Sequence, residues 1–234
     1  MSLIDKTYIV TGASRGIGKT IAMELLEQGA KVVGLSRSSA TIRHQNFKSF
    51  EIDLSQAKEL EQKLKVFVKS VDDLDGVICS AGLGRFGAIE QFSFSQMQSL
   101  MNVNFLSQAL LVRLALPKLK QNARGDVVFI GSEAALNGAK NGAMYCASKF
   151  AIRGFAQSLR EECSKSGVRI SLINPGMVRT DFFNELNFEH GDDDENYIEA
   201  QDIAEAVKLI LATRAGTLFE EINLSPLKKV VKFK

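Results

Sequence analysis

Residues Thr7-Tyr-Ile-Val10 lead directly into Thr11-Gly-Ala-Ser-Arg-Gly-Ile-Gly18, and this stretch decides the fold of the chain. Its first residues have the pattern of a buried strand, and apolar side chains recur at helical spacing from Ile17 to Gln28. Glycines between a strand and a helix allow positive φ angles, and they let a phosphate approach the N–H groups at the helix N-terminus. The stretch therefore predicts a strand, a phosphate-binding turn and a helix.

The rest of the 234-residue chain repeats this alternation of short β-rich runs and longer helical ones. Further strands are predicted at Lys31–Leu35, Phe50–Ile52, Gly76–Cys79, Asp126–Ile130, Val168–Ile173 and Thr217–Leu224. Further helices are predicted at Ser55–Ser70 with Ser55 as N-cap, at Phe94–Lys120 ending near Pro117, at Met144–Ser164 and at Asp202–Leu211. This order predicts an α/β fold, a doubly wound, Rossmann-like parallel sheet of about seven strands with helices on both faces.

No linker divides the chain, so we expect a single domain over residues 1–234. The irregular stretch Arg179–Tyr197 follows a strand at the sheet edge where ligands bind, and it predicts a substrate lid at about residues 179–199. Its acidic run Asp192–Glu195 is interpreted as a solvated loop rather than a metal site. The side chains of Phe182, Phe183, Leu186 and Phe188 in this stretch are either core packing or an apolar substrate wall.

The composition is that of a globular protein, with 45% hydrophobic and 24% charged residues. A net charge of +2 argues against nucleic acid or an anionic membrane as partner. The odd number of cysteines (Cys79, Cys146 and Cys163) argues against a disulfide framework, and two histidines (His44 and His190) are too few for a histidine-rich metal site. No secretory signal and no apolar run near 18 residues is apparent, so we expect a cytoplasmic protein without a metal.

The glycine-rich turn also fits other motifs. Gly12-Ala-Ser-Arg-Gly16 matches a nucleophile elbow, with Ser14 as the nucleophile, but a hydrolase would need His44 or His190 as partner. A P-loop has four residues between its glycines, whereas five separate Gly12 from Gly18. A dinucleotide-binding turn needs no catalytic partner and fits better, while a serine hydrolase and a non-catalytic NADP-binding protein remain as alternatives.

Tyr145-Cys-Ala-Ser-Lys149 begins the helix after the fifth predicted strand. Residues at positions i and i+4 share one helical face, so a phenol and an ammonium can occupy one site. A nearby ammonium favours the phenolate, so we expect the pKa of Tyr145 to fall from about 10 toward neutral pH.

Four motifs occur in order: Thr11–Gly18, Ser132, Tyr145-x-x-x-Lys149 and Asn174-Pro-Gly176. From about Lys6 to Thr180 the chain resembles the short-chain dehydrogenase/reductase family in its compact, single-domain form. The resemblance implies that Tyr145 is the general acid/base, that Lys149 lowers its pKa and holds the nicotinamide ribose, and that Ser132 hydrogen-bonds the substrate carbonyl. It also implies that Asn104 supports a water-mediated proton relay. The activity that the resemblance implies is hydride transfer between NADP(H) and a small-molecule carbonyl or alcohol substrate.

The resemblance also implies a set of cofactor-binding residues. They are Gly12, Ser14, Arg15, Gly16, Ile17, Gly18, Ser36, Arg37, Ser38, Asp53, Leu54, Ser80, Ala81, Gly82, Tyr145, Lys149, Pro175, Gly176, Val178 and Thr180. Among these, Asp53 would contact the adenine, and Thr180 with the Val178 backbone would contact the carboxamide. An NAD-type turn would place a carboxylate near position 36. This chain has Ser36 at that position and Arg37 directly after it. Because Arg37 and Arg15 can bind a 2′-phosphate, NADP is expected in preference to NAD.

Two further expectations follow from single positions. Ser80 stands where the family usually has an asparagine that ties neighbouring strands together, which predicts an effect on stability rather than on catalysis. The two long helices carry apolar residues on more than one side, which predicts partner helices and hence a homodimer or homotetramer. The residues concerned are Leu106, Leu110, Leu114, Phe150 and Phe155.

Overall fold

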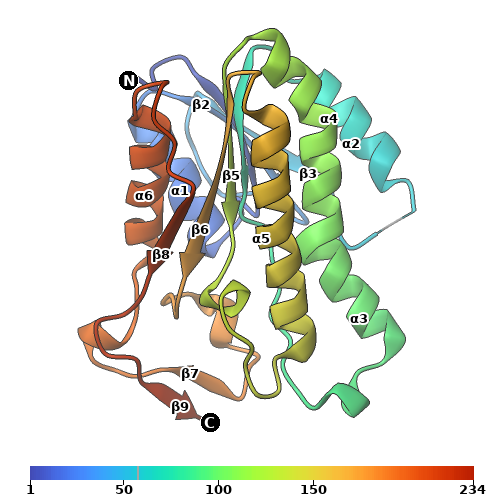
Figure 1. Ribbon diagram of the computed structural model, residues 1–234, viewed down its shortest axis with the longest axis vertical. Helices are drawn as coiled ribbons and strands as arrows, with labels where there is room; N and C mark the ends of the chain where they lie inside the picture. Colours follow the sequence, from blue (N-terminus) through green and yellow to red (C-terminus); the bar gives the residue numbers. More distant parts are fainter. Residues whose placement is uncertain (57) are drawn as a thin grey trace.

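The computed structural model describes residues 1–56 and 58–234, and a parallel sheet of seven strands forms its centre (Figure 1). The strand order is β3-β2-β1-β4-β5-β6-β8, and all neighbours are parallel. The strands are β1 (Thr7–Thr11), β2 (Lys31–Ser36), β3 (Phe47–Glu51), β4 (Leu74–Cys79), β5 (Gly125–Ile130), β6 (Val168–Pro175) and β8 (Glu221–Leu224). This is the predicted doubly wound fold.

Helices cover both faces of the sheet (Figure 1). They are α1 (Gly16–Glu27), α2 (Leu60–Lys69), α3 (Phe94–Met101), α4 (Ser107–Gln121), α5 (Ala143–Cys163) and α6 (Ala200–Ala212). One hydrophobic core lies between the sheet and helices α1 and α6, and the other lies between the sheet and helices α2, α4 and α5. All five residues of β1 are buried, so its central sequence Tyr-Ile-Val is a continuous apolar run rather than an alternating one.

The order of the strands changes direction at β1, which lies between β2 and β4. The connections after β1 and β4 therefore leave the sheet in opposite directions and open a crevice at its carboxyl edge. The glycine-rich turn follows β1 at this crevice, so topology and sequence motif point to the same edge.

Several predicted element boundaries were wrong. Strand β3 begins at Phe47, and α2 begins at Leu60 rather than at Ser55; position 57, within the predicted helix, lies outside the described residues. Ser55 is not a helix cap, because its backbone N–H and its hydroxyl both donate hydrogen bonds to Asp53. Pro117 lies inside α4 and does not end it. Complete burial of neighbouring side chains such as Leu119 offsets the single hydrogen bond that proline removes.

The helical stretch Phe94–Gln121 corrects another expectation. By length and composition it could cross a membrane, since an 18-residue window has a mean hydropathy of 1.3. Its first half contains polar residues but no charged ones. It therefore passes the composition criterion although it is not an unbroken apolar run. In the fold this stretch packs against α2, β4 and α5. Burial against these elements explains many of its apolar side chains.

The segment predicted as a lid is more regular than expected. It contains strand β7 (Phe188–His190), which pairs antiparallel with β9 (Val231–Phe233) near the end of the chain. Neither strand was predicted. The acidic run is exposed to solvent, as expected, and Asp192 and Glu195 form surface ion pairs with Lys232 and Lys228. The carboxyl-terminal tail and the segment 179–199 are therefore held to each other.

Candidate active site

Three positions of the glycine-rich turn favour glycine, through a positive φ angle or through close approach of the backbone. Gly12 and Gly16 have φ angles of +73° and +53°. A Cβ on Gly12 would lie 3.1 Å from the Cα of Ala81, and a Cβ on Gly18 would lie 2.4 Å from the carbonyl oxygen of Gly12. The turn therefore packs against the start of α1 and the end of β4 without intervening side chains.

The N-terminus of α1 lies open toward this turn. No side chain caps it, because the N-cap residue Arg15 makes no side-chain hydrogen bond to the first turn of the helix. Uncapped N–H groups at a helix N-terminus carry partial positive charge and bind anions such as a pyrophosphate. The turn and the helix end together fit a dinucleotide.

Three of the predicted catalytic residues meet where β5 ends and α5 begins. Ser132 follows β5, and Tyr145 and Lys149 lie on one face of the first turns of α5. All three are buried, with 9%, 8% and 5% of their surface exposed. The Lys149 ammonium donates a hydrogen bond to the Ile130 carbonyl over 3.2 Å and lies 5.8 Å from the centre of the Tyr145 ring.

The pKa of Tyr145 contradicts the expectation drawn from the Tyr–Lys spacing. Burial raises the pKa of Tyr145 to about 12, although the neighbouring Ser132 hydroxyl acts in the opposite direction. Burial also lowers the pKa of Lys149 to about 8. Desolvation penalises the charged form of each group, and here it outweighs the attraction that the sequence spacing suggested. Tyr145 consequently keeps its proton at neutral pH.

Asn104 connects the loop after β4 with α5. It is completely buried within a π-helical turn, Asn102–Leu106, between α3 and α4. Its amide nitrogen donates hydrogen bonds to the Leu83 carbonyl (3.0 Å) and to the Ser148 hydroxyl (3.1 Å). Its oxygen accepts from the Leu83 N–H over 2.9 Å. The π-helical turn and Ser148 escaped sequence analysis, although Ser148 lies between Tyr145 and Lys149 in the motif.

Gly82 marks the point where the catalytic group meets the dinucleotide turn. A Cβ on Gly82 would lie 3.6 Å from Asn104 Oδ1 and 3.8 Å from Lys149 Nζ. On the other side, the backbone N–H groups of Ser80 and Ala81 both donate to the Thr11 hydroxyl over 2.9 Å. The loop after β4 is thus shared by both parts of the site.

The side chain of Ser80 contributes no hydrogen bond among the described residues to the connection between the strands. Its hydroxyl oxygen is buried and has no hydrogen-bond partner among the described residues. The connection between β1 and β4 comes instead from Thr11 and the backbone at positions 80 and 81. The serine leaves the strand connection intact and costs one unpaired buried polar atom.

The end of the site beyond β2 and β3 carries positive charge. Arg37 and Arg15 are both exposed, whereas the Ser36 hydroxyl is buried and donates to the Ser38 carbonyl over 2.8 Å. Burial tends to raise the pKa of Asp53, but hydrogen bonds from Ser55 and Gln56 and the charge of Arg37 prevail and lower it. Arg37 therefore lies near Asp53, and Leu54 beside it is buried.

The opposite end of the site lies beyond β6. Pro175 ends this strand, and the Gly176 N–H donates to the Leu224 carbonyl over 2.8 Å. Val178 is buried and forms an isolated bridge with Ile198. A Cβ on Gly16 would lie 3.7 Å from the Thr180 side chain, so Thr180 adjoins the glycine-rich turn. The predicted cofactor residues therefore line one edge of the sheet, from β3 to β6, and their arrangement fits a nicotinamide dinucleotide.

Comparison with known proteins gives the family. A family model described as short chain dehydrogenase matches residues 6–190. The chain belongs to the short-chain dehydrogenase family. This short-chain dehydrogenase is 31% identical to an uncharacterised oxidoreductase of Staphylococcus aureus strain MW2, over 96% of its own length and 98% of the relative's.

Solved structures of the family superpose closely on this short-chain dehydrogenase. A metagenomic short-chain oxidoreductase in complex with NADP is 28% identical, with a TM-score of 0.80 and coverage of 98% of this chain and 100% of the other. An alcohol dehydrogenase of Thermococcus sibiricus, complexed with 5-hydroxy-NADP, is 26% identical, with a TM-score of 0.84 and coverage of 96% and 98%. The chain is an oxidoreductase by family, as its curated relatives are.

The hydrolase alternative finds no support in this short-chain dehydrogenase. His44 is exposed and accepts a hydrogen bond from the Asn46 N–H over 3.1 Å. The His190 ring packs against Tyr197, with its Nδ1 2.7 Å from the Gly191 carbonyl. Across residues 1–56 and 58–234, neither histidine hydrogen-bonds Ser14. Among the described residues, Ser14 therefore has no histidine as the base that would activate it.

Proposed function

We propose that this short-chain dehydrogenase transfers a hydride between NADP(H) and a small carbonyl or alcohol substrate, with Tyr145 as the general acid/base. The observation that carries the proposal is the placement of Ser132, Tyr145 and Lys149 in one buried group beside the dinucleotide turn. Hydroxyl groups at that position can stabilise negative charge as it develops on a carbonyl oxygen. A binding protein without catalysis would not need a buried phenol and ammonium there.

The roles of the side chains follow from their protonation and contacts. When bound, the nicotinamide supplies or accepts the hydride, which no side chain can do. Tyr145 holds its proton at neutral pH and donates it to the carbonyl oxygen during reduction, while Ser132 donates a hydrogen bond to the same oxygen. Lys149 holds the nicotinamide ribose and returns a proton to Tyr145. Asn104 supports this transfer through water.

We further propose that NADP is preferred over NAD. Arg37 and Arg15 are exposed at the end of the site that would receive a 2′-phosphate, and position 36 carries a serine rather than a carboxylate. Guanidinium groups bind phosphates through charge-assisted hydrogen bonds. The similar structures described above hold NADP or 5-hydroxy-NADP, which agrees with this preference.

A screen of NADPH oxidation tests the proposed function. Purified enzyme is mixed with NADPH and a panel of ketones, aldehydes and 3-oxoacyl thioesters, and the loss of absorbance at the nicotinamide band is followed. We expect turnover with at least one class and a much lower rate with the Tyr145→Phe variant. Binding of NADPH without oxidation by any carbonyl compound, and without reduction of NADP by any alcohol, would favour the non-catalytic alternative.

Gly18→Ala is expected to weaken NADPH binding by about tenfold or more. The new methyl group would lie 2.4 Å from the Gly12 carbonyl oxygen, so the turn must move away from its anion-binding geometry. The same clash should cost about 1–3 kcal/mol in free energy of unfolding. Fluorescence titration and denaturant unfolding measure the two effects. Gly154→Ala is the matched control, because nothing lies within 4 Å of a Cβ there. Unchanged NADPH affinity in Gly18→Ala would contradict the assignment of the turn.

We also propose that the chain acts in the cytoplasm as one domain over residues 1–234, with residues 179–199 as its substrate lid. The ion pairs and the β7–β9 pairing give this lid a defined anchor on the carboxyl-terminal tail. Its partner is a small molecule, and we expect no nucleic-acid or membrane partner.

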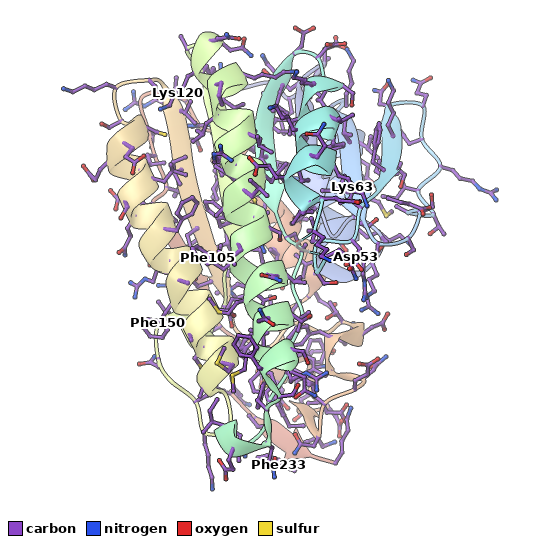
Figure 2. All side chains as sticks on the ribbon, turned by 90° about the vertical axis from the view of Figure 1, so that its right-hand side faces the viewer. Asp53, Lys63, Phe105, Lys120, Phe150 and Phe233 are labelled. Carbon is purple, nitrogen blue, oxygen red and sulfur yellow. The ribbon has the colours of Figure 1, made fainter. Side chains whose placement is uncertain are left out.

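A homodimer or homotetramer is proposed from the outer faces of two neighbouring helical stretches (Figure 2). Leu106 and Phe150 are 52% and 44% exposed there. Leu110, Leu114 and Phe155 were also expected at the interface, but they pack against the chain's own core. Sedimentation velocity at micromolar concentrations should show a species of at least two chains, and Phe150→Glu should shift it toward the monomer. A native monomer across that range would contradict the proposal.

A further inference from the structure

The ring of Tyr145 is one corner of a closed circuit of five aromatic side chains. Its centroid lies 4.9 Å from that of Phe86 and 6.1 Å from that of Phe182. Phe86 lies 4.9 Å from Phe188, Phe188 lies 5.9 Å from Phe183, and Phe183 lies 5.2 Å from Phe182. All five separations fall in the range of favourable aromatic contacts. We call these residues the aromatic circuit.

The aromatic circuit is assembled from three separate parts of the chain. Tyr145 comes from α5, Phe86 from the loop after β4, and the other three rings from the segment 179–199. A Cβ on Gly84 would lie 2.4 Å from the Phe182 ring, so the glycine lets that ring reach the loop. The circuit therefore depends on close contact between separate segments of the chain and not on one apolar stretch of sequence.

The carboxyl-terminal tail holds the far side of the circuit. Phe188 lies in β7 and pairs with Phe233 of β9, and the Lys234 ammonium donates to the Phe183 carbonyl over 3.0 Å. Phe233 itself lies at the end of the molecule opposite Lys120 (Figure 2). These contacts fix the rings of the lid against the phenol of Tyr145.

Some charged side chains next to members of the circuit or its segment are paired with each other. Glu133, next to Ser132, forms an ion pair with Lys229 over 2.7 Å, and Arg179 forms one with Glu199. A charged substituent placed among the rings would lose its hydration, whereas an aromatic substituent would exchange one ring contact for another. Arg85 is exposed in the same loop as Phe86, so an anionic substrate needs a direct test.

We propose that the aromatic circuit receives the substituent of the substrate, so that the substrate class is uncharged carbonyl compounds bearing an aromatic ring. Phe86 and Phe182, which both contact the Tyr145 ring, determine this specificity. The inference rests on the proposed function, because it concerns the substrate of the same site.

Three carbonyl compounds separate ring from charge. Acetophenone is uncharged and carries a ring, butan-2-one is uncharged without a ring, and phenylglyoxylate carries the ring and a carboxylate. We expect kcat/KM for acetophenone to exceed that for each of the others by about tenfold or more. Phe86→Ala and Phe182→Ala should lower the acetophenone value by about tenfold, mainly through KM, and change the butan-2-one value less than about threefold.

Two further variants keep this experiment decisive. Phe86→Leu retains bulk without a ring, so it tests the aromatic contact if Phe86→Ala lowers the thermal midpoint of unfolding. Phe94→Ala removes a phenylalanine that is 73% exposed and that makes no ring contact with the circuit among the described residues, and it should leave all three values unchanged. Preference for butan-2-one or phenylglyoxylate, or an equal loss on all three substrates in folded Phe86→Leu, would overturn the inference while leaving the proposed function in place.

A binding measurement separates failure of the inference from failure of the proposed function. If no carbonyl compound is turned over, saturation-transfer NMR with acetophenone and NADPH still reports contact of the ring with the protein. We expect a signal with the native chain that Phe86→Ala reduces severalfold and Phe94→Ala does not. Equal signals in the native chain and Phe86→Ala, or none in either, would overturn the inference.

Discussion

Tyr145→Phe should lower kcat by about 10²–10⁴-fold while NADPH affinity stays within about threefold of the native value, since loss of a general acid has effects of this size. Tyr145 is 8% exposed, and its ring contacts Phe86 and Phe182. Phenylalanine keeps those ring contacts and removes only the hydroxyl that carries the proton. Because burial raises the pKa of Tyr145 to about 12, the native phenol is protonated at neutral pH, and the variant lacks this proton donor.

Steady-state kinetics and fluorescence titration with NADPH measure the two quantities separately. Tyr197→Phe is the matched control, because the Tyr197 hydroxyl donates to Asp194 in the lid and accepts from Arg179. We expect that control to retain most of its kcat. A Tyr145→Phe variant with more than half of the native kcat would show that another group donates the proton.

Replacing Ser36 by aspartate together with Arg37 by alanine should reverse the preference for the cofactor. The native enzyme should favour NADPH over NADH by about tenfold to a thousandfold in kcat/KM. One charge-assisted hydrogen bond of about 1.5 kcal/mol accounts for the lower limit and two of about 2 kcal/mol each for the upper limit, at about 1.4 kcal/mol per factor of ten. The aspartate would repel the 2′-phosphate and accept a hydrogen bond from a free 2′-hydroxyl.

The salt dependence gives an independent check on this assignment. Arg37 and Arg15 are exposed, so high salt should reduce the native preference for NADPH by screening their attraction for the phosphate. Arg37→Ala alone should lose most of the preference without disturbing the buried Ser36 hydroxyl, which donates to the Ser38 carbonyl. Arg214→Ala, an exposed arginine that contributes to neither motif, is the control and should leave the preference unchanged. Equal kcat/KM for NADPH and NADH in the native enzyme would contradict the role of Arg37.

Local patterns predicted those parts of the fold whose residues interact with near neighbours. The apolar residues of β1, the glycines of the turn and the helical spacing through α1 each act within a few residues, so the strand, the turn and the helix were predictable. Boundaries were predicted less well. Ser55 reads as an N-cap in isolation, but in the structure it hydrogen-bonds Asp53 instead.

The candidate site likewise has parts that local sequence predicted and parts that it did not predict. The Tyr145–Lys149 spacing places both residues on one helical face whatever surrounds them, and Ser132 and the glycine-rich turn are recognisable as motifs. The contacts of Asn104 with Leu83 and Ser148 join three elements, so the sequence held no signal for them. Strands β7 and β9 are only three residues each, and their stability comes from pairing across about 40 residues of chain.

The sequence by itself determined the fold class, the edge of the sheet where a dinucleotide fits, and which residues stand at that edge, because periodicity and glycine geometry are local properties. Only the tertiary structure decided the protonation of Tyr145 and Lys149. The ammonium four residues away favours the phenolate, yet burial among other elements raises the pKa of Tyr145 to about 12. Only the tertiary structure, too, brought Phe86 and the rings of the lid around that phenol. Desolvation and ring packing depend on which distant segments cover a residue, and that information is absent from its neighbours in the chain.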